Sequence, residues 1–253
     1  MTDNDRLDFV RCLVTLATDR AEIGDSAGAL DALERLAIGS YGSDPDVLVR
    51  RALSSGFVSV AIALLDAGDP AAAVRAGERL ATVFPHESDP DVTLDLARGL
   101  HNLALHRARA GDVSGAINAG RLLLAKYGSD PSPDIREAVA QGLRNLAIDQ
   151  ASRGEVSDAV ETGQRLVALF GDDQRPVIRG AVSGGMVNLG DHLALLGRIT
   201  EAVAAGEQLV AMFGADTDPS VRECVERAQS DLAERRRATD PDGPHTLSEF
   251  LGG

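Results

Sequence analysis

Apolar and polar positions alternate along this 253-residue chain with a helical period, and a longer period lies above it. Within each stretch, large apolar side chains recur three or four positions apart, as on one face of an α-helix. The stretches come in pairs, a longer one and a shorter one separated by a glycine, and the pairs recur about every 43 residues. Self-similarity at this period predicts a stack of helical hairpins.

Three series of residues mark the repeat. An aromatic residue closes each shorter helix: Tyr41, Phe84, Tyr127, Phe170 and Phe213. A glycine lies at the turn inside each pair: Gly24, Gly68, Gly111, Gly154 and Gly197. A proline opens each longer helix: Pro45, Pro90, Pro133, Pro176 and Pro219. Nearly every step is 43 residues, and chance is a poor explanation for three series with one period.

The residues around these marks predict where the helices begin and end. Proline suits the first helical position, and the residue before it then serves as N-cap. The predicted N-caps are Asp44, Asp89, Ser132 and Asp218. Glycine suits the left-handed residue after a helix end. We therefore predict five pairs over about 4–41, 45–84, 90–127, 133–170 and 176–213, a polar cap helix over 219–237 and a flexible tail over 238–253.

Positions counted from the turn glycine predict the packing. Positions −15, −11 and −8 of the first helix are large and apolar, whereas positions +5 and +12 of the second helix are always Ala and Leu. Glycine recurs at position −12, which predicts close backbone contact between helices: Gly56, Gly99, Gly142 and Gly185. Arginine recurs at position −18, and we expect it to pair with acidic or carbonyl groups of the "SDP" loops.

Composition and charge narrow the class. Hydrophobic residues make up 44% of the chain but aromatic residues only 3%, which favours closely packed helices over sheet. The formal charge of −14 disfavours nucleic acid and anionic membranes as partners. No apolar run approaches 18 residues and no secretory signal is present, so we expect no membrane span. Two distant cysteines, Cys12 and Cys224, suit free thiols in a reducing cytoplasm.

Three aligned blocks, "NLALHRARAGDVSGAI", "NLAIDQASRGEVSDAV" and "NLGDHLALLGRITEAV", resemble the tetratricopeptide repeat, and the long unit resembles its kinesin-light-chain variety. The resemblance covers roughly residues 4–237 and implies an all-α, right-handed α-solenoid superhelix of about five repeats. The family's aromatic position in the second helix departs from the pattern: it is Leu33, Gly77, Gly120, Gly163 and Gly206 here. Leucine replaces a later small residue, a coupled exchange that keeps volume and alters packing. Armadillo and HEAT arrays are the alternative architecture.

The resemblance implies a concave groove, lined by the first helices, that binds peptides through asparagine side chains. The matching residues, at position −9, are Asn102, Asn145 and Asn188, with Thr15 and Ser59 in the first two units. Helical spacing adds Arg98, His106 and Arg109, then Gln141 and Asp149, then His192, with Arg144 at the groove edge. Alternatively, each asparagine bonds only to the backbone of a neighbouring helix or loop.

We therefore expect a non-enzymatic scaffold or adaptor that binds a protein or peptide and has no cofactor. Its negative charge favours a basic partner, although Arg98, Arg109 and Arg144 leave an acidic group open. One alternative is a self-associating structural or regulatory homo-oligomer, in which the tail segment "LSEFL" docks into a groove. Another is a small-molecule or metal site at His106, Asp149 and His192, but ligands on helices about 8–10 Å apart would converge poorly.

Overall fold

The structure is a computed structural model that describes residues 2–39, 41–84 and 87–239. Over these residues it holds eleven α-helices, one short 3₁₀ helix and no strand, which confirms the all-α helical-repeat fold. The chain divides into two compact units, residues 1–149 and 150–253, each described by itself. The predicted single domain over residues 1–237 stays a prediction. The predicted turn Leu247–Leu251 and the docking segment "LSEFL" lie outside the described residues.

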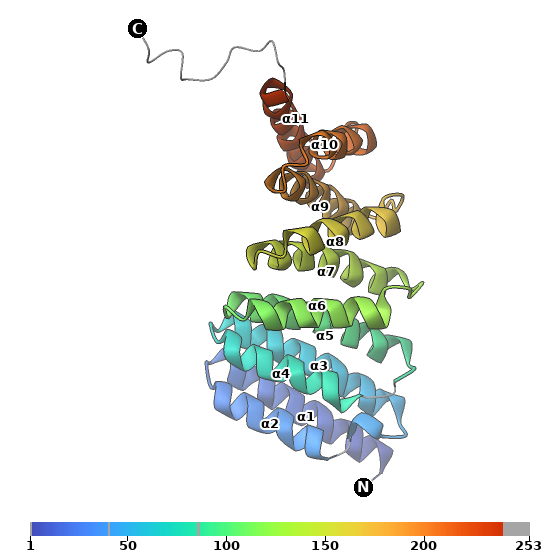
Figure 1. Cartoon of the computed structure of the whole chain (residues 1–253). Helices are drawn as coiled ribbons and strands as arrows, with labels where there is room; N and C mark the ends of the chain where they lie inside the picture. The colour runs from blue at the N-terminus through green and yellow to red at the C-terminus, as the bar shows by residue number, and fades with distance from the viewer. Residues whose placement is uncertain (1, 40, 85–86, 240–253) are drawn as a thin grey trace. The chain divides into compact units, whose positions relative to one another are not determined.

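Unit 1 is a series of antiparallel helix pairs (Figure 1). Its helices are α1 (Asp3–Glu22), α2 (Ser26–Ile38), α3 (Val47–Asp66), α4 (Pro70–Val83), α5 (Pro90–Arg109), α6 (Val113–Tyr127) and α7 (Pro133–Ser152), with the 3₁₀ helix η1 (Tyr41–Ser43) after α2. The first helices pack on one another, α1 on α3 and α3 on α5, and each also packs on the second helix of its own pair. The unit boundary falls within the last turn of α7.

Unit 2 continues the same alternation of a long helix and a shorter one. Its helices are α8 (Val156–Phe170), α9 (Pro176–Leu195), α10 (Ile199–Phe213) and α11 (Pro219–Thr239). Helix α9 packs on α8, α10 and α11. The predicted prolines therefore open α9 and α11, and the predicted aromatic residues close α8 and α10.

The turn inside every pair is made by a left-handed glycine, as predicted. The five turn glycines have φ between +73° and +87°. A Cβ atom built on any of them would meet nothing within 4 Å, so the backbone conformation alone requires glycine there. The next residue caps the second helix in the first three pairs: the side chains of Asp25, Asp69 and Asp112 each accept a backbone N–H three residues on.

Two predicted helix ends in the first loop are wrong. The N-cap of α3 is Asp46, whose carboxylate accepts from the Leu48 N–H at 2.9 Å, and not Asp44. Asp44 is buried instead, and it accepts a hydrogen bond from Arg6 Nε at 2.9 Å. Helix α2 ends at Ile38, so Tyr41 lies in η1 and not at the helix end. Asp44, which the local sequence pattern predicts as the N-cap of α3, thus binds Arg6 of α1 instead.

Successive pairs interlock through leucine side chains that sit on glycine. A Cβ added to Gly99 of α5 would lie under 3.0 Å from the Leu80 side chain of α4. In the reverse direction, a Cβ added to Gly77 of α4 would lie 3.2 Å from Leu103 of α5. The helices therefore approach by seating leucine on bare backbone, and the predicted direct backbone-to-backbone contact at position −12 is corrected.

The same interlock recurs in both units. Within unit 1, Leu123 of α6 sits on Gly142 and Leu146 of α7 sits on Gly120. Within unit 2, the corresponding pairs are Leu166 on Gly185, Leu189 on Gly163 and Leu232 on Gly206. Each leucine is at most 7% exposed, so the predicted large-for-small exchange is present as a packing contact.

The first pair follows a different rule. Leu33 occupies the glycine position of α2, and it is buried. Gly56 of α3 therefore receives Val14 of α1 in place of a leucine from α2. In keeping with this, α3 packs mainly on α1 and α4 and only lightly on α2.

By length and composition alone, α3 is the one described helix that could cross a membrane. Its side chains Leu53, Phe57 and Leu64 are nevertheless fully buried in the core of unit 1. The apolar character of α3 thus matches its place between α1, α4 and α5.

The interlock predicts that Gly99→Ala destabilises the protein, although alanine is the better helix former. The added Cβ would overlap Leu80, and overpacking of this kind costs about 1–3 kcal/mol. The matched control is Gly180→Ala in α9, whose Cβ would meet only the Ser220 hydroxyl at an ordinary 3.7 Å; it should gain about 0.5–1 kcal/mol. Thermal melts followed by circular dichroism measure both, and a higher Tm for Gly99→Ala would contradict the interlock.

Candidate functional site

Two adjoining hollows lie between α1 and α3 on the face formed by the first helices of unit 1. The first has a volume of ≈ 500 Å³ and is lined by Arg11, Val14, Thr15, Leu48, Arg51, Ala52, Ser55, Gly56 and Ser59. The second has a volume of ≈ 440 Å³ and is lined by Thr18, Glu22, Ser59, Ile62, Ala63, Asp66 and Ala67. Ser59 lines both hollows, so they meet at that residue.

The hollows and the predicted asparagine row share position −9 of the first helices. Thr15 and Ser59 occupy this position in α1 and α3, and both line a hollow. Asn102 and Asn145 occupy it in α5 and α7, where both are half-buried. Neither asparagine side chain forms a hydrogen bond within the part of the chain that the structure describes. The alternative role for them, bonding to a neighbouring backbone, therefore has no contact to support it.

Four other predicted groove residues of α5 and α7 are exposed or half-buried. Arg98, Arg109 and Arg144 are exposed and Gln141 is half-buried. A Cβ added to Gly142 would lie 3.9 Å from His101 Nδ1, so α5 and α7 are neighbours at this level. The two position −9 asparagines and the three arginines thus lie on neighbouring helices, α5 and α7, of unit 1. Their role in binding stays a prediction.

The position −5 residues lie deeper than expected. His106 is only 2% exposed, and its imidazole lies close to the backbone of Ala73 in α4. Burial lowers the pKa of His106, and it raises the pKa of the half-buried Asp149 to about 6. His106 therefore lies between a first helix and the preceding second helix, where it offers almost no surface to a ligand in the groove.

Helical geometry explains this depth. Position −5 continues the stripe of positions −8, −12 and −15, which the spacing of three and four residues places on one face. The constant alanine at position +5, Ala73 in α4, makes room for it. At the adjacent position −6, Ile62 is 43% exposed and Ile148 is 41% exposed, whereas Leu105 is half-buried. The sequence pattern, which places polar side chains on this face, does not predict these exposed isoleucines.

In unit 2, ion pairs join α9 to α11 at the position −6 residue of α9, Asp191. Asp191 accepts from Arg227 at 2.6 Å and from Arg235 at 2.7 Å. Close by in sequence, the amide nitrogen of Asn188 is buried without a hydrogen-bond partner in the described residues, and His192 is 7% exposed with its pKa lowered by burial. The predicted residues Asn188 and His192 thus belong to a face that is already partly covered by charged side chains.

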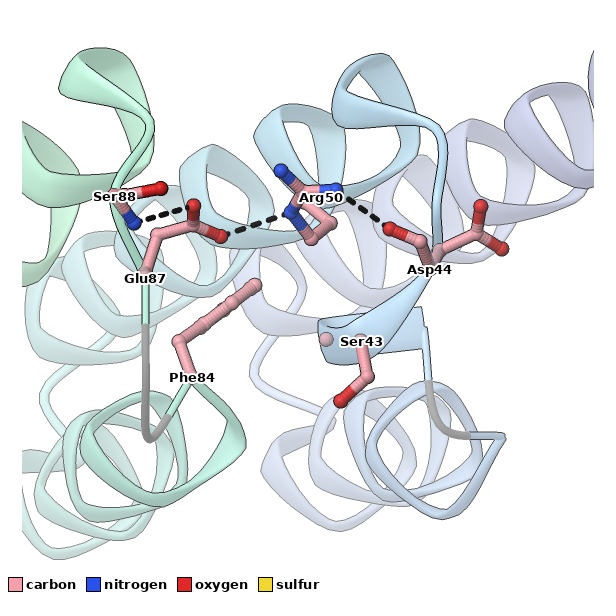
Figure 2. A pocket seen from close by; sticks show the side chains of 7 residues that line it. Ser43, Asp44, Arg50, Phe84, Glu87 and Ser88 are labelled. Atoms are coloured by element: carbon pink, nitrogen blue, oxygen red, sulfur yellow. Dashed lines mark hydrogen bonds and ion pairs between the residues drawn. The ribbon is translucent and has the colours of Figure 1, made fainter.

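A third pocket, of ≈ 270 Å³, opens among the loops that follow α2 and α4 (Figure 2). It is lined by Gly42, Ser43, Asp44, Arg50, Phe84, Glu87 and Ser88. Arg50 donates to the Glu87 carboxylate at 2.9 Å and to the Asp44 carbonyl at 2.6 Å. Because these charged groups satisfy one another, we interpret the pocket as a structural contact between the two loops.

The contact in this pocket is one instance of a recurring arginine pairing. Arg6 pairs with Asp44 in the same way, and in unit 2 Arg179 pairs with Asp216 at 3.0 Å. These contacts confirm the predicted loop partners for Arg6, Arg50 and Arg179, whereas Arg222 pairs with Glu226 of its own helix α11.

Metal binding gains no support from the geometry. No group of three His, Cys, Asp or Glu side chains among the described residues could hold a metal ion. His106 and Asp149 lie in unit 1, whereas His192 lies in unit 2.

Burial of His106 predicts a loss of stability on acidification. A histidine in the unfolded chain takes up a proton near pH ~6.5, whereas the pKa of His106 in the folded chain is lower. The unfolded state then binds more protons, so stability falls as pH drops through this range. We expect His106→Gln, which keeps a polar side chain that does not titrate, to lose less Tm than the wild type between about pH 7.5 and about pH 5.5. Equal losses would contradict this role of His106.

No protein-family profile matches the chain, and no curated protein matches it. Among solved structures, the chain is similar to a protein of Podosopora anserina, described as a kinesin light chain with nearly identical TPR-like repeats. The identity is 20%, the TM-score is 0.52, and the match covers 83% of this chain and 97% of the other. It is also similar to BtubC (BKLC) of P. vanneervenii, at 19% identity and a TM-score of 0.52, with 90% of this chain and 94% of the other covered.

Identities this low speak for the fold alone. Both similar structures support the tetratricopeptide resemblance over the armadillo and HEAT alternative, and the long 43-residue unit agrees with the kinesin-light-chain variety. The fold of this chain is therefore that of a tetratricopeptide-like helical-repeat solenoid.

Proposed function

We propose that this protein is a non-catalytic interaction scaffold that binds an extended peptide segment of a partner protein on the first-helix face of unit 1. The observation that carries the proposal is the pair of hollows between α1 and α3, which meet at Ser59. Ser59 belongs to the same position as Asn102 and Asn145 on the next two first helices. The hollows and the asparagines thus form one candidate row across four helices.

The chemistry of this row suits a peptide backbone. Val14 and Ile62 supply apolar surface in the two hollows. The hydroxyl of Ser59 and the amide of Asn102 can each donate and accept a hydrogen bond, as a peptide unit also does. Side chains of this kind hold a backbone without reading its sequence, and the apolar surface contributes binding energy.

The charges at the two hollows give the proposed peptide a direction. Arg11 lines the first hollow and forms no ion pair among the described residues. Arg51 lines it too, but its guanidinium is bound to Asp89 at 2.8 Å. Glu22 and Asp66 line the second hollow. We infer a segment with an acidic group near Arg11 and a basic group near Glu22 and Asp66.

The similar fold of the two solved repeat proteins agrees with a scaffold. Fold does not fix function, however, so the proposal rests on the site. A basic or amphoteric peptide is favoured over a wholly acidic one because the chain carries a net charge of −14.

The proposal predicts that Ser59→Arg abolishes peptide binding. Peptides selected from a random display library against the full chain would be labelled and titrated by fluorescence anisotropy. The arginine fills the junction of both hollows, so we expect affinity to fall at least about tenfold, or about 1.4 kcal/mol. The double variant Asn102→Ala/Asn145→Ala should lose about 1–3 kcal/mol, for two hydrogen bonds.

The matched control is Leu122→Ser on α6, where a 41% exposed leucine lies outside both hollows. It should bind the selected peptides as the wild type does. Circular dichroism verifies that every variant is folded. Selected peptides that bind Ser59→Arg and the double variant with undiminished affinity would sink the proposal.

A further inference from the structure

Helix α1 carries core-type side chains on a face that no described helix covers. Phe9 is 44% exposed and Leu16 is 39% exposed. Cys12, between them on the same helical stripe, is exposed as well. Ile23, at the end of α1, extends the stripe and is 81% exposed. The Phe9 ring lies 6.0 Å from the Tyr41 ring, which fixes its place at the edge of the stripe.

In every later pair, the corresponding residues are buried. Position −15 is Leu53, Leu96, Val139 or Val182, and none of these exceeds 7% exposure. Position −8 is Val60, Leu103, Leu146 or Leu189, and none of these exceeds 6%. From the third pair on, the cover at position −8 is the preceding second helix, whose glycine accepts the leucine. The face of α1 therefore has the composition of a helix-packing surface, but no helix among the described residues packs on it.

The residues of the stripe set the size of what fits there. A leucine at position −8 is received by glycine in the covering helix, as Leu146 is by Gly120. The helix over Leu16 therefore needs glycine or alanine at the contact. Later first helices have glycine at position −12, where a Cβ would overlap the covering leucine. Cys12 already has a Cβ there, so the covering helix needs a small residue at that contact too.

Charge narrows the partner further. Asp5, Asp8 and Asp19 are exposed and lie on or beside the stripe by helical spacing. Arg20, the arginine nearest the stripe by helical spacing, is turned away, because its guanidinium donates to the Gly28 carbonyl at 3.2 Å. Arg11, next to Cys12 in sequence, lies on the side of α1 that lines the first hollow. Two copies of this chain joined through α1 would bring two acidic stripes together, which like-charge repulsion disfavours. A helix with lysine or arginine beside its apolar stripe has the complementary charge.

We propose that this open face of α1, defined by Phe9, Cys12 and Leu16, binds an amphipathic helix of a partner protein. That helix has small residues along its contact stripe and basic residues on its flanks. The binding mode reproduces the packing of a second helix on the following first helix. The site is separate from the hollows between α1 and α3, and it stands without the proposed peptide function.

A probe can be taken from the chain itself. Residues 113–127, "VSGAINAGRLLLAKY", form a second helix with two basic residues and no acidic one. A capped, fluorescein-labelled peptide of this sequence with Leu123→Ala presents Gly120 to Leu16 and a small residue to Cys12. The matched control peptide carries Gly120→Leu in addition, with the same charge and a bulkier contact.

Anisotropy with the full chain tests binding, and thiol modification tests its location. We expect the probe to bind and the control peptide to bind at least about tenfold more weakly. Leu16→Ser should weaken the probe at least about tenfold, whereas Leu195→Ser, at a 73% exposed leucine of unit 2, should not. In a Cys224→Ser background, the probe should slow modification of Cys12 several-fold. High salt should weaken binding.

Several outcomes would overturn the proposal. One is equal binding of the two peptides, and another is binding that leaves the modification rate of Cys12 unchanged. A dimer in sedimentation that Leu16→Ser converts to a monomer would assign the face to a second copy of this chain. If removing residues 240–253 speeds the modification of Cys12 in the free protein, the chain's own tail covers the face.

Discussion

From α4 on, leucine side chains seated on glycine hold each second helix against the first helix that follows it. The contact runs in both directions, as Leu80 on Gly99 and Leu103 on Gly77 show. A reciprocal contact fixes how far one helix slides along the other and how far each rotates, because either movement would drive a side chain into backbone. The orientation of the position −9 side chains on α5 and α7 depends on that rotation, whereas the hollows lie between α1 and α3, where Gly56 receives Val14 instead.

The fixed rotation sorts neighbouring positions into different environments. Position −5 is turned toward the preceding helix, so His106 is buried and its pKa is lowered, while position −6, one residue earlier, leaves Ile62 exposed. The arginine pairings of the loops act at the other end of each pair, where Arg50 joins the loops after α2 and α4. Buried apolar contact and partly buried charge thus hold the two ends of a pair by different means.

Features with a local cause could be predicted from the sequence. The turn glycines and the helix pairs follow from periodicity and from backbone conformation. The cap of α3 could not, because Asp44 is drawn away by Arg6 from 38 residues earlier. The depth of His106 was inferable in principle, since position −5 continues an apolar stripe. The hollows beside Ser59 depend on the spacing of α1 and α3, which no single helix encodes.

The interlock also has a consequence for how such an array can be rearranged. A helix pair with glycine in its second helix packs on a first helix that carries leucine at the contact. This holds at Gly77, Gly120, Gly163 and Gly206. The first helix pair has Leu33 in place of this glycine, and the next first helix has Val60 in place of the leucine, so the contact between the first two pairs differs from the later ones. The same glycine and leucine contact recurs at every described junction from α4 on, whereas the first pair makes a different contact with its neighbour. We therefore expect exchange of one internal pair for another to keep this contact, and exchange of the first pair to break it.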